Sequence, residues 1–255
     1  MDSMGDRLKR YEALSENVLL PRLPVFLRLD GNSFSKFTAR HEFQKPRDMR
    51  FEDAMNAAAI RVLEYCSGAQ LAYVQSDEIT ILLRNDQTPA TEPFLGNRTQ
   101  KLASLTAGRA SVAFSRRLRD LGIDAEAIFD CRVFVVPPAE VNNVFLWRQL
   151  DAFKNAVQGF AYWEIGRLLG RGTTDRLIHG MSTSQLQELI YTRLGINFND
   201  VPTAFKRGRC IVPGTSLPPE RTGPGEGEST GSSRWTVDDE IPLFNRDRGY
   251  IERFL

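Results

Sequence analysis

The chain has 255 residues, of which 42% are hydrophobic and 25% charged. These proportions are typical of a soluble globular protein with one large domain or two small ones. The net charge of +1 excludes a global positive field for nucleic acid, so a polyanion would have to bind local basic patches. The sequence has neither a long apolar run nor an apolar secretory region, so no membrane partner is expected. Three widely spaced cysteines fit neither a disulfide framework nor a zinc site, which favours a cytoplasmic location.

The first half of the chain alternates between strand and helix patterns. Short apolar runs bounded by Pro or Gly indicate strands, and apolar residues at helical spacing indicate amphipathic helices. The predicted elements are a strand at 25–29, a helix at 47–65, strands at 71–74 and 79–83, a helix at 99–118 and a strand at 127–136. The order β-α-β-β-α-β predicts an α+β protein with the ferredoxin-like, or split βαβ, arrangement.

The second half predicts helices and one composition break. Helices are expected at 142–169 and at 184–194, the latter capped by Ser182 or Thr183. Residues 213–233 are rich in Gly, Pro, Ser and Thr, which predicts a flexible loop. Apolar residues return after this loop, with a short strand at 241–244. The expected domains are a palm-like catalytic domain at 1–140, a helical extension packed on it at 141–212, the loop at 213–233, and a C-terminal segment at 234–255 that docks back.

Two acidic positions form the candidate site. Asp30 ends the first predicted strand and is followed by Gly31, which allows close approach to a ligand. Asp77 lies in the turn of the predicted hairpin, and in the split βαβ order the two carboxylates should face each other. Two ionised carboxylates repel and therefore need a cation, and oxygen ligands suit Mg²⁺. Two such ions about 3.5–4 Å apart can clamp the attacking and leaving oxygens of a phosphoryl transfer, as in a polymerase palm.

Taken singly, each acidic motif is more typical of an ordinary turn. An Asp-Gly after a strand is usually a turn, and Ser-Asp-Glu is usually a solvated hairpin tip. Their combination on adjoining strands favours the metal site. Basic residues surround it: Lys45 is placed to reach a triphosphate, as cations do in phosphoryl transfer. Further arginines that could contact phosphates are Arg109, Arg116, Arg117 and Arg119.

Several segments together resemble the tRNA(His) guanylyltransferase family, and they occur in the family's order. The resemblance covers about residues 23–212. Its motifs are Arg-Leu-Asp-Gly at 28–31, Phe-Gln-Lys-Pro at 43–46, Tyr-Val-Gln-Ser-Asp-Glu at 73–78, Trp-Arg-Gln at 147–149, Gly-Ile-Asn-Phe-Asn at 195–199 and Phe-Lys-Arg-Gly at 205–208. It implies a polymerase-like palm that adds nucleotides in the 3′-to-5′ direction at the 5′ end of tRNA, with ATP or GTP activating a 5′-monophosphate.

The resemblance also implies roles for individual residues. Asp30, the Gly31 carbonyl and Asp77 would bind two Mg²⁺ ions, and Glu78 would support the catalytic metal shell. The nucleotide site would be lined by Asp30, Gly31, Asn32, Ser33, Phe34, Ser35, Lys45, Ser76 and Asp77. Asn155, Lys206 and Arg207 would contact tRNA. The expected partners are tRNA, GTP, ATP and other nucleoside triphosphates, in a homotetramer.

Two departures separate this chain from the eukaryotic members. These carry His-Ile-Asn-Asn after Trp-Arg-Gln, whereas the segment here is Phe-Lys-Asn-Ala at 153–156, and Ser35 replaces a His. The pattern resembles the guanylyltransferase-like branch, which implies templated repair of 5′-truncated tRNA by Watson–Crick pairing. The alternatives are addition of a single G to tRNA(His), nucleotidyl cyclisation on a related palm, and a non-catalytic RNA-binding module.

Overall fold

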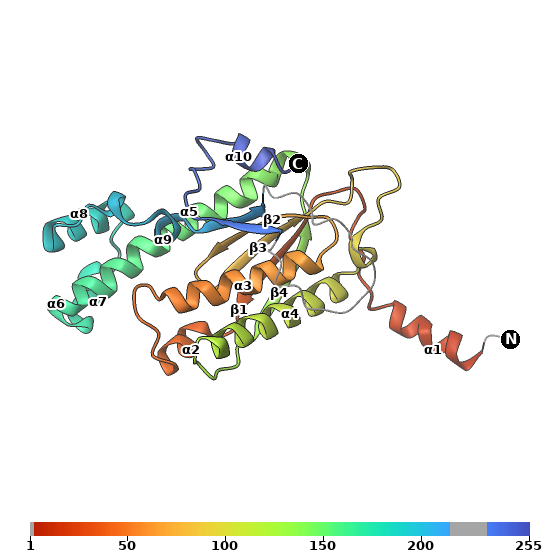
Figure 1. Cartoon of the computed structure of the whole chain (residues 1–255), viewed down its shortest axis with the longest axis horizontal. Coiled ribbons are helices and arrows are strands. Elements are labelled where there is room, and N and C mark those ends of the chain that lie inside the picture. Colours follow the sequence, from red (N-terminus) through yellow and green to blue (C-terminus); the bar gives the residue numbers. More distant parts are fainter. Residues whose placement is uncertain (1–2, 215–233) are drawn as a thin grey trace.

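The computed structural model describes residues 3–214 and 234–255 and is built around one antiparallel sheet (Figure 1). Six strands lie in the order β4-β1-β3-β2-β5-β6, and each pairs with its neighbours in antiparallel fashion. Their bounds are Val25–Gly31 (β1), Ala69–Gln75 (β2), Glu78–Leu83 (β3), Phe129–Val135 (β4), Arg209–Pro213 (β5) and Trp235–Asp238 (β6). Strand β3 lies between β1 and β2, so the predicted split βαβ arrangement is confirmed.

Helices surround this sheet and extend beyond it. They are α1 (Met4–Ala13), α2 (Phe34–Arg40), α3 (Met49–Tyr65), α4 (Thr99–Asp120), α5 (Val141–Phe160), α6 (Gly166–Leu169), α7 (Arg171–Ile178), α8 (Thr183–Leu194), α9 (Thr203–Arg207) and α10 (Gly249–Glu252). A π-helical turn at Ala161–Ile165 joins α5 to α6. Ser182 caps α8 through a capping box with Gln185, as one of the two expected caps.

The two faces of the sheet bury different residues because side chains alternate along each strand. Val25, Leu27 and Leu29 of β1 face α3 and α4, where the larger core lies. Phe26 and its neighbours face α5 and the C-terminal segment (Figure 1). A third, separate core joins the π-helical turn to α8. Asp30 and Arg28 fall on the α5 face, so this face carries the candidate site.

The predicted strand at 241–244 is wrong. These residues form no ladder, and the strand of this segment is β6, which extends the sheet beside β5. Pro242 cannot donate to a ladder. The Gln149 side chain makes the backbone hydrogen bonds that a neighbouring strand would otherwise make. Its amide N–H donates to the Pro242 carbonyl at 2.8 Å, and its oxygen accepts from the Phe244 N–H at 3.0 Å. Ile241 and Phe244 are thereby buried against the α5 face.

Some elements had no sequence prediction. The short helices α2, α7 and α9 and strand β5 were not expected, and neither was α1. Strand β5 falls at the end of the segment predicted as a helical extension. The predicted loop at 213–233 lies outside the described residues except for Pro213, which ends β5, and Gly214. Within the described parts of the chain, no helix is both long and apolar enough to cross a membrane.

Candidate active site

A row of three acidic residues crosses the sheet at the end of β1. Asp30 is in register with Glu78 on β3 and with Asp130 on β4, so all three side chains lie on the α5 face. Like charges directly opposite each other destabilise a sheet. Burial, followed by the negative charge of Asp77 and of the other two acids of the row, raises the pKa of Asp30. The row therefore holds an excess of negative charge that a cation would relieve.

Asp77 lies beside this row in the hairpin turn. The turn consists of Ser76 and Asp77, and Ser76 adopts a left-handed φ of 46°. The Asp77 carbonyl accepts a hydrogen bond from the Gly31 N–H at 3.0 Å, which fixes the turn against the end of β1. The register partner of Asp30 is thus Glu78, and Asp77 approaches Asp30 from the turn rather than from a strand.

The packing of the Phe34 ring requires a glycine at position 31, independently of any bound ligand. A side chain at this position would collide with the ring of Phe34. That ring is buried in the main core, where its centroid lies 5.0 Å from that of Phe129. The predicted nucleotide role of Phe34 can therefore rest only on its backbone. The side chains of Asn32, Ser33 and Ser35 are exposed beside it and remain accessible to a ligand.

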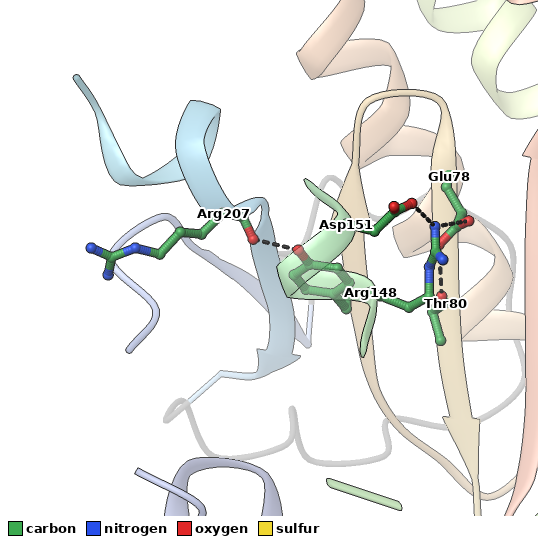
Figure 2. A network of polar contacts seen from close by, with 6 residues as sticks. Glu78, Thr80, Arg148, Asp151 and Arg207 are labelled. Carbon is green, nitrogen blue, oxygen red and sulfur yellow. Dashed lines mark hydrogen bonds and ion pairs between the residues drawn. The ribbon is translucent and has the colours of Figure 1, made fainter. Parts of the chain in front are cut away.

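Glu78 is engaged by an arginine that sequence reasoning had not assigned to the site. Arg148 on α5 donates to the two Glu78 carboxylate oxygens at 2.7 and 2.8 Å and to Asp151 at 3.1 Å (Figure 2). The side chains of Arg148 and Glu78 are only 9% and 11% exposed. The geometry suits the predicted supporting role of Glu78, because its charge is already paired with a buried guanidinium.

A basic row lies two residues away from the acidic row on the same face. Arg28 on β1 is in register with Arg132 on β4. Neither makes an ion pair within residues 3–214 and 234–255, although Arg28 lies over the Trp147 ring at 5.2 Å. A pocket of about 300 Å³ is bordered by both rows, and it is lined by Arg28, Asp30, Glu78, Arg132, Trp147 and Arg148. Two adjacent guanidinium groups of this kind are suited to phosphate oxygens.

A second cavity, of about 240 Å³, opens near Asp77 between α5, α9 and residues 43–48. It brings together Lys45, Ser76 and Asn155 on its polar side. The Lys45 ammonium donates to Thr38 Oγ1 at 3.0 Å. Burial lowers the pKa of Lys45, while Asp77 and Asp48 oppose this shift. Its aromatic lining is contributed by Phe43, Phe51, Trp163 and Phe205, and such a cavity suits a nucleoside with its phosphates towards Lys45.

The three residues predicted to contact tRNA do not form one surface. Asn155 lines the cavity beside Lys45. Lys206 is buried and donates to the Asn199 carbonyl. The Arg207 carbonyl accepts from the Tyr73 hydroxyl, while its guanidinium points away from the sheet (Figure 2). Only Arg207 of the basic pair therefore presents its charge outward.

Asp48 holds the loop that carries Lys45, and this predicts a pH-dependent stability. Its carboxylate accepts from the N–H groups of Gln44 and Arg50 at 2.8 and 2.9 Å and caps α3. Burial opposes ionisation, but these bonds and the Arg50 guanidinium hold the pKa of Asp48 at about 2. Because the pKa of Asp48 is depressed in the folded state, its ionised carboxylate contributes to the free energy of unfolding above the ordinary pKa near 4. This contribution is lost as the pH falls through 2.

We expect Asp48→Ala to lower the free energy of unfolding by about 1 kcal/mol at neutral pH, the usual value for an N-cap. Chemical denaturation of the variant and the unsubstituted protein at pH 7, 4 and 2.5 measures this difference. It should shrink towards the lowest pH. A difference that is constant across this range would contradict the role of the ionised carboxylate.

The residues present fit a divalent metal. Asp30 and Asp77 supply two carboxylates, and the hydrogen bond from the Gly31 N–H to the Asp77 carbonyl holds the hairpin turn against the end of β1. Within the described chain, no three acidic, His or Cys side chains converge on a single point. Two carboxylates nevertheless suffice for Mg²⁺, which keeps several waters and is commonly bound through one or two carboxylates together with substrate phosphates.

Comparisons with known proteins identify the family of this chain. A family model described as tRNAHis guanylyltransferase matches residues 5–137, and one described as Thg1 C terminal domain matches residues 139–235. The tRNA(His) guanylyltransferase of Debaryomyces hansenii is 30% identical over 220 residues, covering 82% of this chain and 80% of that protein. That of Schizosaccharomyces pombe is 31% identical over 218 residues, with the same coverage of 82% and 80%.

Solved structures give the same result. A bacterial tRNA(His) guanylyltransferase-like protein in complex with ATP matches with a TM-score of 0.84 and 34% identity over 99% of both chains. The guanylyltransferase of Saccharomyces cerevisiae matches with a TM-score of 0.71 and 25% identity over 82% of this chain and 93% of that one. This chain therefore belongs to the tRNA(His) guanylyltransferase family of nucleotidyltransferases.

Proposed function

We propose that this protein adds nucleotides in the 3′-to-5′ direction to the 5′ end of tRNA, in a templated repair of truncated ends that depends on Mg²⁺. The observation that carries the proposal is the pair of charged rows on the α5 face. Three acids in register lie next to two arginines in register, with no ion pair between the rows among the residues that the structure describes. Glu78 is paired with Arg148, but the like charges of Asp30 and Asp130, and those of Arg28 and Arg132, lie directly opposite each other, which a cation and phosphates would relieve.

The two concave regions suit two different nucleotides. The cavity beside Lys45 would hold the activating ATP or GTP, with the nucleoside against its aromatic wall. The pocket of Arg28 and Arg132 would hold the phosphates of the incoming nucleotide. Asp30, Asp77 and the Gly31 carbonyl would hold two Mg²⁺ ions between them. The ions would supply charge neutralisation and a lower pKa for the attacking hydroxyl.

The chemistry then divides into two displacements. An oxygen of the tRNA 5′-monophosphate attacks the α-phosphorus of ATP or GTP, and pyrophosphate leaves. The 3′-hydroxyl of the incoming nucleotide next attacks the activated 5′-phosphorus, and the nucleoside monophosphate leaves. Lys45 would orient the first triphosphate, and Arg28 with Arg132 would orient the second. Glu78, paired with Arg148, would hold the acidic row in position.

Residues 153–156 favour templated repair over addition of a fixed G. The Phe153 ring packs against Phe198 with their centroids 5.9 Å apart, so this position serves the core of the extension. It stands where the eukaryotic pattern has the His of His-Ile-Asn-Asn. The bacterial guanylyltransferase-like protein, solved with ATP and with GTP, also aligns over 99% of this chain. Both observations support the guanylyltransferase-like branch.

The test is extension of a labelled tRNA(His) and a second tRNA, each shortened by one 5′ nucleotide and supplied with one nucleoside triphosphate at a time. We expect incorporation of the nucleotide that pairs with the opposing base, and a changed preference when that base is changed. Incorporation of G opposite every base would contradict templating and favour strict guanylyltransferase activity. Cyclic nucleotide formation without RNA would favour a cyclase, and RNA binding without any addition would favour a binding module.

Two further expectations belong to this proposal. A homotetramer is supported by large apolar side chains that remain exposed on the single chain, such as Tyr11, Val112 and Ile128. A cytoplasmic location is supported by Cys66, Cys131 and Cys210, which are all free thiols. Mass measurement in solution tests the first expectation, and imaging of the tagged protein tests the second.

A further inference from the structure

Trp147 lines the pocket between the two charged rows, and it is not buried. The exposed fraction of its side chain is 52%, whereas Phe145, two residues earlier on α5, is fully buried in the core of the α5 face. Trp and Tyr carry a large apolar surface and are enriched where a protein meets a partner or a ligand. An exposed indole that lines a pocket is therefore available to stack on a bound molecule.

The position of this indole is fixed by the two residues that follow it on α5. The Arg148 guanidinium pairs with Glu78 on the sheet, and the Gln149 side chain makes two hydrogen bonds to the C-terminal segment. Both side chains are buried, so α5 cannot rotate without breaking these bonds. Trp147 is thereby held beside the pocket with its ring exposed.

Two guanidinium groups orient the ring. The Arg28 Cζ lies 5.2 Å from the centre of the Trp147 ring, and the Arg148 Cζ lies 4.7 Å from it. Cations are attracted to the face of an indole, so these contacts restrict the rotation of the side chain. About half of the side chain nevertheless stays accessible, as its exposed fraction shows. A ring that is oriented before a ligand arrives loses little conformational entropy when the ligand binds.

The pocket offers suitable chemistry to each part of a nucleotide. Arg28 and Arg132 carry the positive charge that suits phosphate oxygens, and Trp147 presents a flat aromatic surface. Trp147 is the only aromatic residue among the described residues that line this pocket. Every nucleobase has a π-face that can stack on such a ring. An anion site and a stacking surface therefore lie side by side in one pocket.

The two nucleotide pockets differ in how far they enclose a base. The Lys45 cavity has several aromatic side chains, and none of them is exposed: Phe43, Phe51, Trp163 and Phe205. The pocket of the charged rows has the single exposed ring of Trp147. A single ring covers the face of a base and leaves the hydrogen-bonding edge free. A free edge is what pairing with a template base requires.

We propose that the Trp147 indole stacks on the base of the incoming nucleoside triphosphate while Arg28 and Arg132 hold its phosphates. Stacking depends little on which base is present, so the contact serves all four nucleotides and leaves their selection to the template base. This inference rests on the proposed function, since it takes the pocket of the charged rows as the site of the incoming nucleotide.

The first test measures the KM of the incoming nucleotide. A 5′-truncated tRNA that carries a 5′-triphosphate needs no activating nucleotide, because attack of the 3′-hydroxyl on its α-phosphorus releases pyrophosphate. Four such tRNAs, which differ in the template base, are each extended with the complementary nucleotide. Trp147→Ala should raise the nucleotide KM roughly 5- to 150-fold for all four, the usual range for loss of one stacking contact. Trp147→Phe should recover most of this loss, because a phenyl ring also stacks.

Leu150→Ala is the matched control. The Leu150 side chain is 57% exposed on the same helix, and it is not among the described residues that line the pocket. Its nucleotide KM should be unchanged. An unchanged KM in Trp147→Ala, an equal increase in Leu150→Ala, or an increase for one base alone would overturn the inference. An increase confined to the KM of tRNA would overturn it as well, by showing that the ring stacks on RNA.

Photo-crosslinking locates the base without any turnover. The full-length protein is irradiated with iodouridine triphosphate and Mg²⁺ in the absence of RNA, and the modified residue is identified by mass spectrometry. An adduct on Trp147 that excess UTP suppresses is expected, because iodouracil couples to aromatic rings on which it stacks. Adducts confined to the rings of the Lys45 cavity, or no adduct, would overturn the inference. If the Trp147 adduct forms but the unsubstituted protein extends no tRNA, the proposed function fails and the stacking contact stands.

Discussion

Replacing Asp77 with Ala is expected to reduce nucleotide addition to tRNA by roughly a thousandfold or more. The reason is that we propose Asp77 and Asp30 as the carboxylates that hold a catalytic metal, and burial together with the negative charge of Asp77 raises the pKa of Asp30. A metal that stabilises the charge of a transferring phosphoryl group contributes several kcal/mol, which corresponds to this change in rate. Extension of labelled, 5′-truncated tRNA at saturating Mg²⁺ measures the loss.

The binding of tRNA by Asp77→Ala should change little, because loss of a carboxylate removes a repulsive charge rather than a contact. Asp124→Ala is a matched control, since the Asp124 side chain is 90% exposed and lies outside the acidic row. Retention of both addition and its Mg²⁺ dependence in Asp77→Ala would contradict the metal assignment. A parallel loss of tRNA binding would instead point to a folding defect.

Much of the fold followed from local pattern. The alternation of strand and helix periodicity gave the split βαβ order, and the strand predicted at 127–136 is β4, which ends at Val135 shortly before Pro137 and Pro138. The prediction failed at Ile241–Phe244, where apolar residues are buried by side-chain hydrogen bonds from Gln149 rather than by a ladder. Local sequence cannot distinguish these cases, because the partner lies nearly a hundred residues away in the chain.

The candidate site was predictable only in part. Asp30 and Asp77 were proposed from the sequence because Asp30 ends an apolar strand pattern and Asp77 lies in the turn between two such patterns. The role of Arg132 could not be predicted without the register of β4 against β1, which places Arg132 beside Arg28. Side chains two residues apart along a strand lie on the same face, so Arg28 lies on the same face as Asp30. One arginine of the basic row could therefore have been predicted from the sequence. Arg148 lies on a helix, and its bond to Glu78 depends on how α5 crosses the sheet.

We expect Arg148→Met to lower the free energy of unfolding by about 3–5 kcal/mol, the usual cost of removing one partner from a buried ion pair. The variant leaves the Glu78 carboxylate buried, without its bidentate partner and in register with Asp30. Chemical denaturation measures the change. Arg248→Met is the matched control, because Arg248 and its partner Glu252 are each 55% exposed, and such a surface pair contributes about 0–1 kcal/mol.

The Glu78→Met/Arg148→Met double variant separates structural from chemical roles. Removing both charges takes away the uncompensated carboxylate, so the double variant should be more stable than Arg148→Met alone. If it is not, the ion pair is not the source of the loss. Nucleotide addition by the folded double variant, compared with that by Arg148→Met, then tests Glu78 itself, because Arg148 also lines the pocket. Because Asp30 and Asp77 remain, a support role predicts reduced but measurable addition, since substitution of groups that orient metal ligands typically costs roughly 10–100-fold. Complete loss would place Glu78 among the metal ligands, where its present bond to Arg148 would have to exchange for the metal.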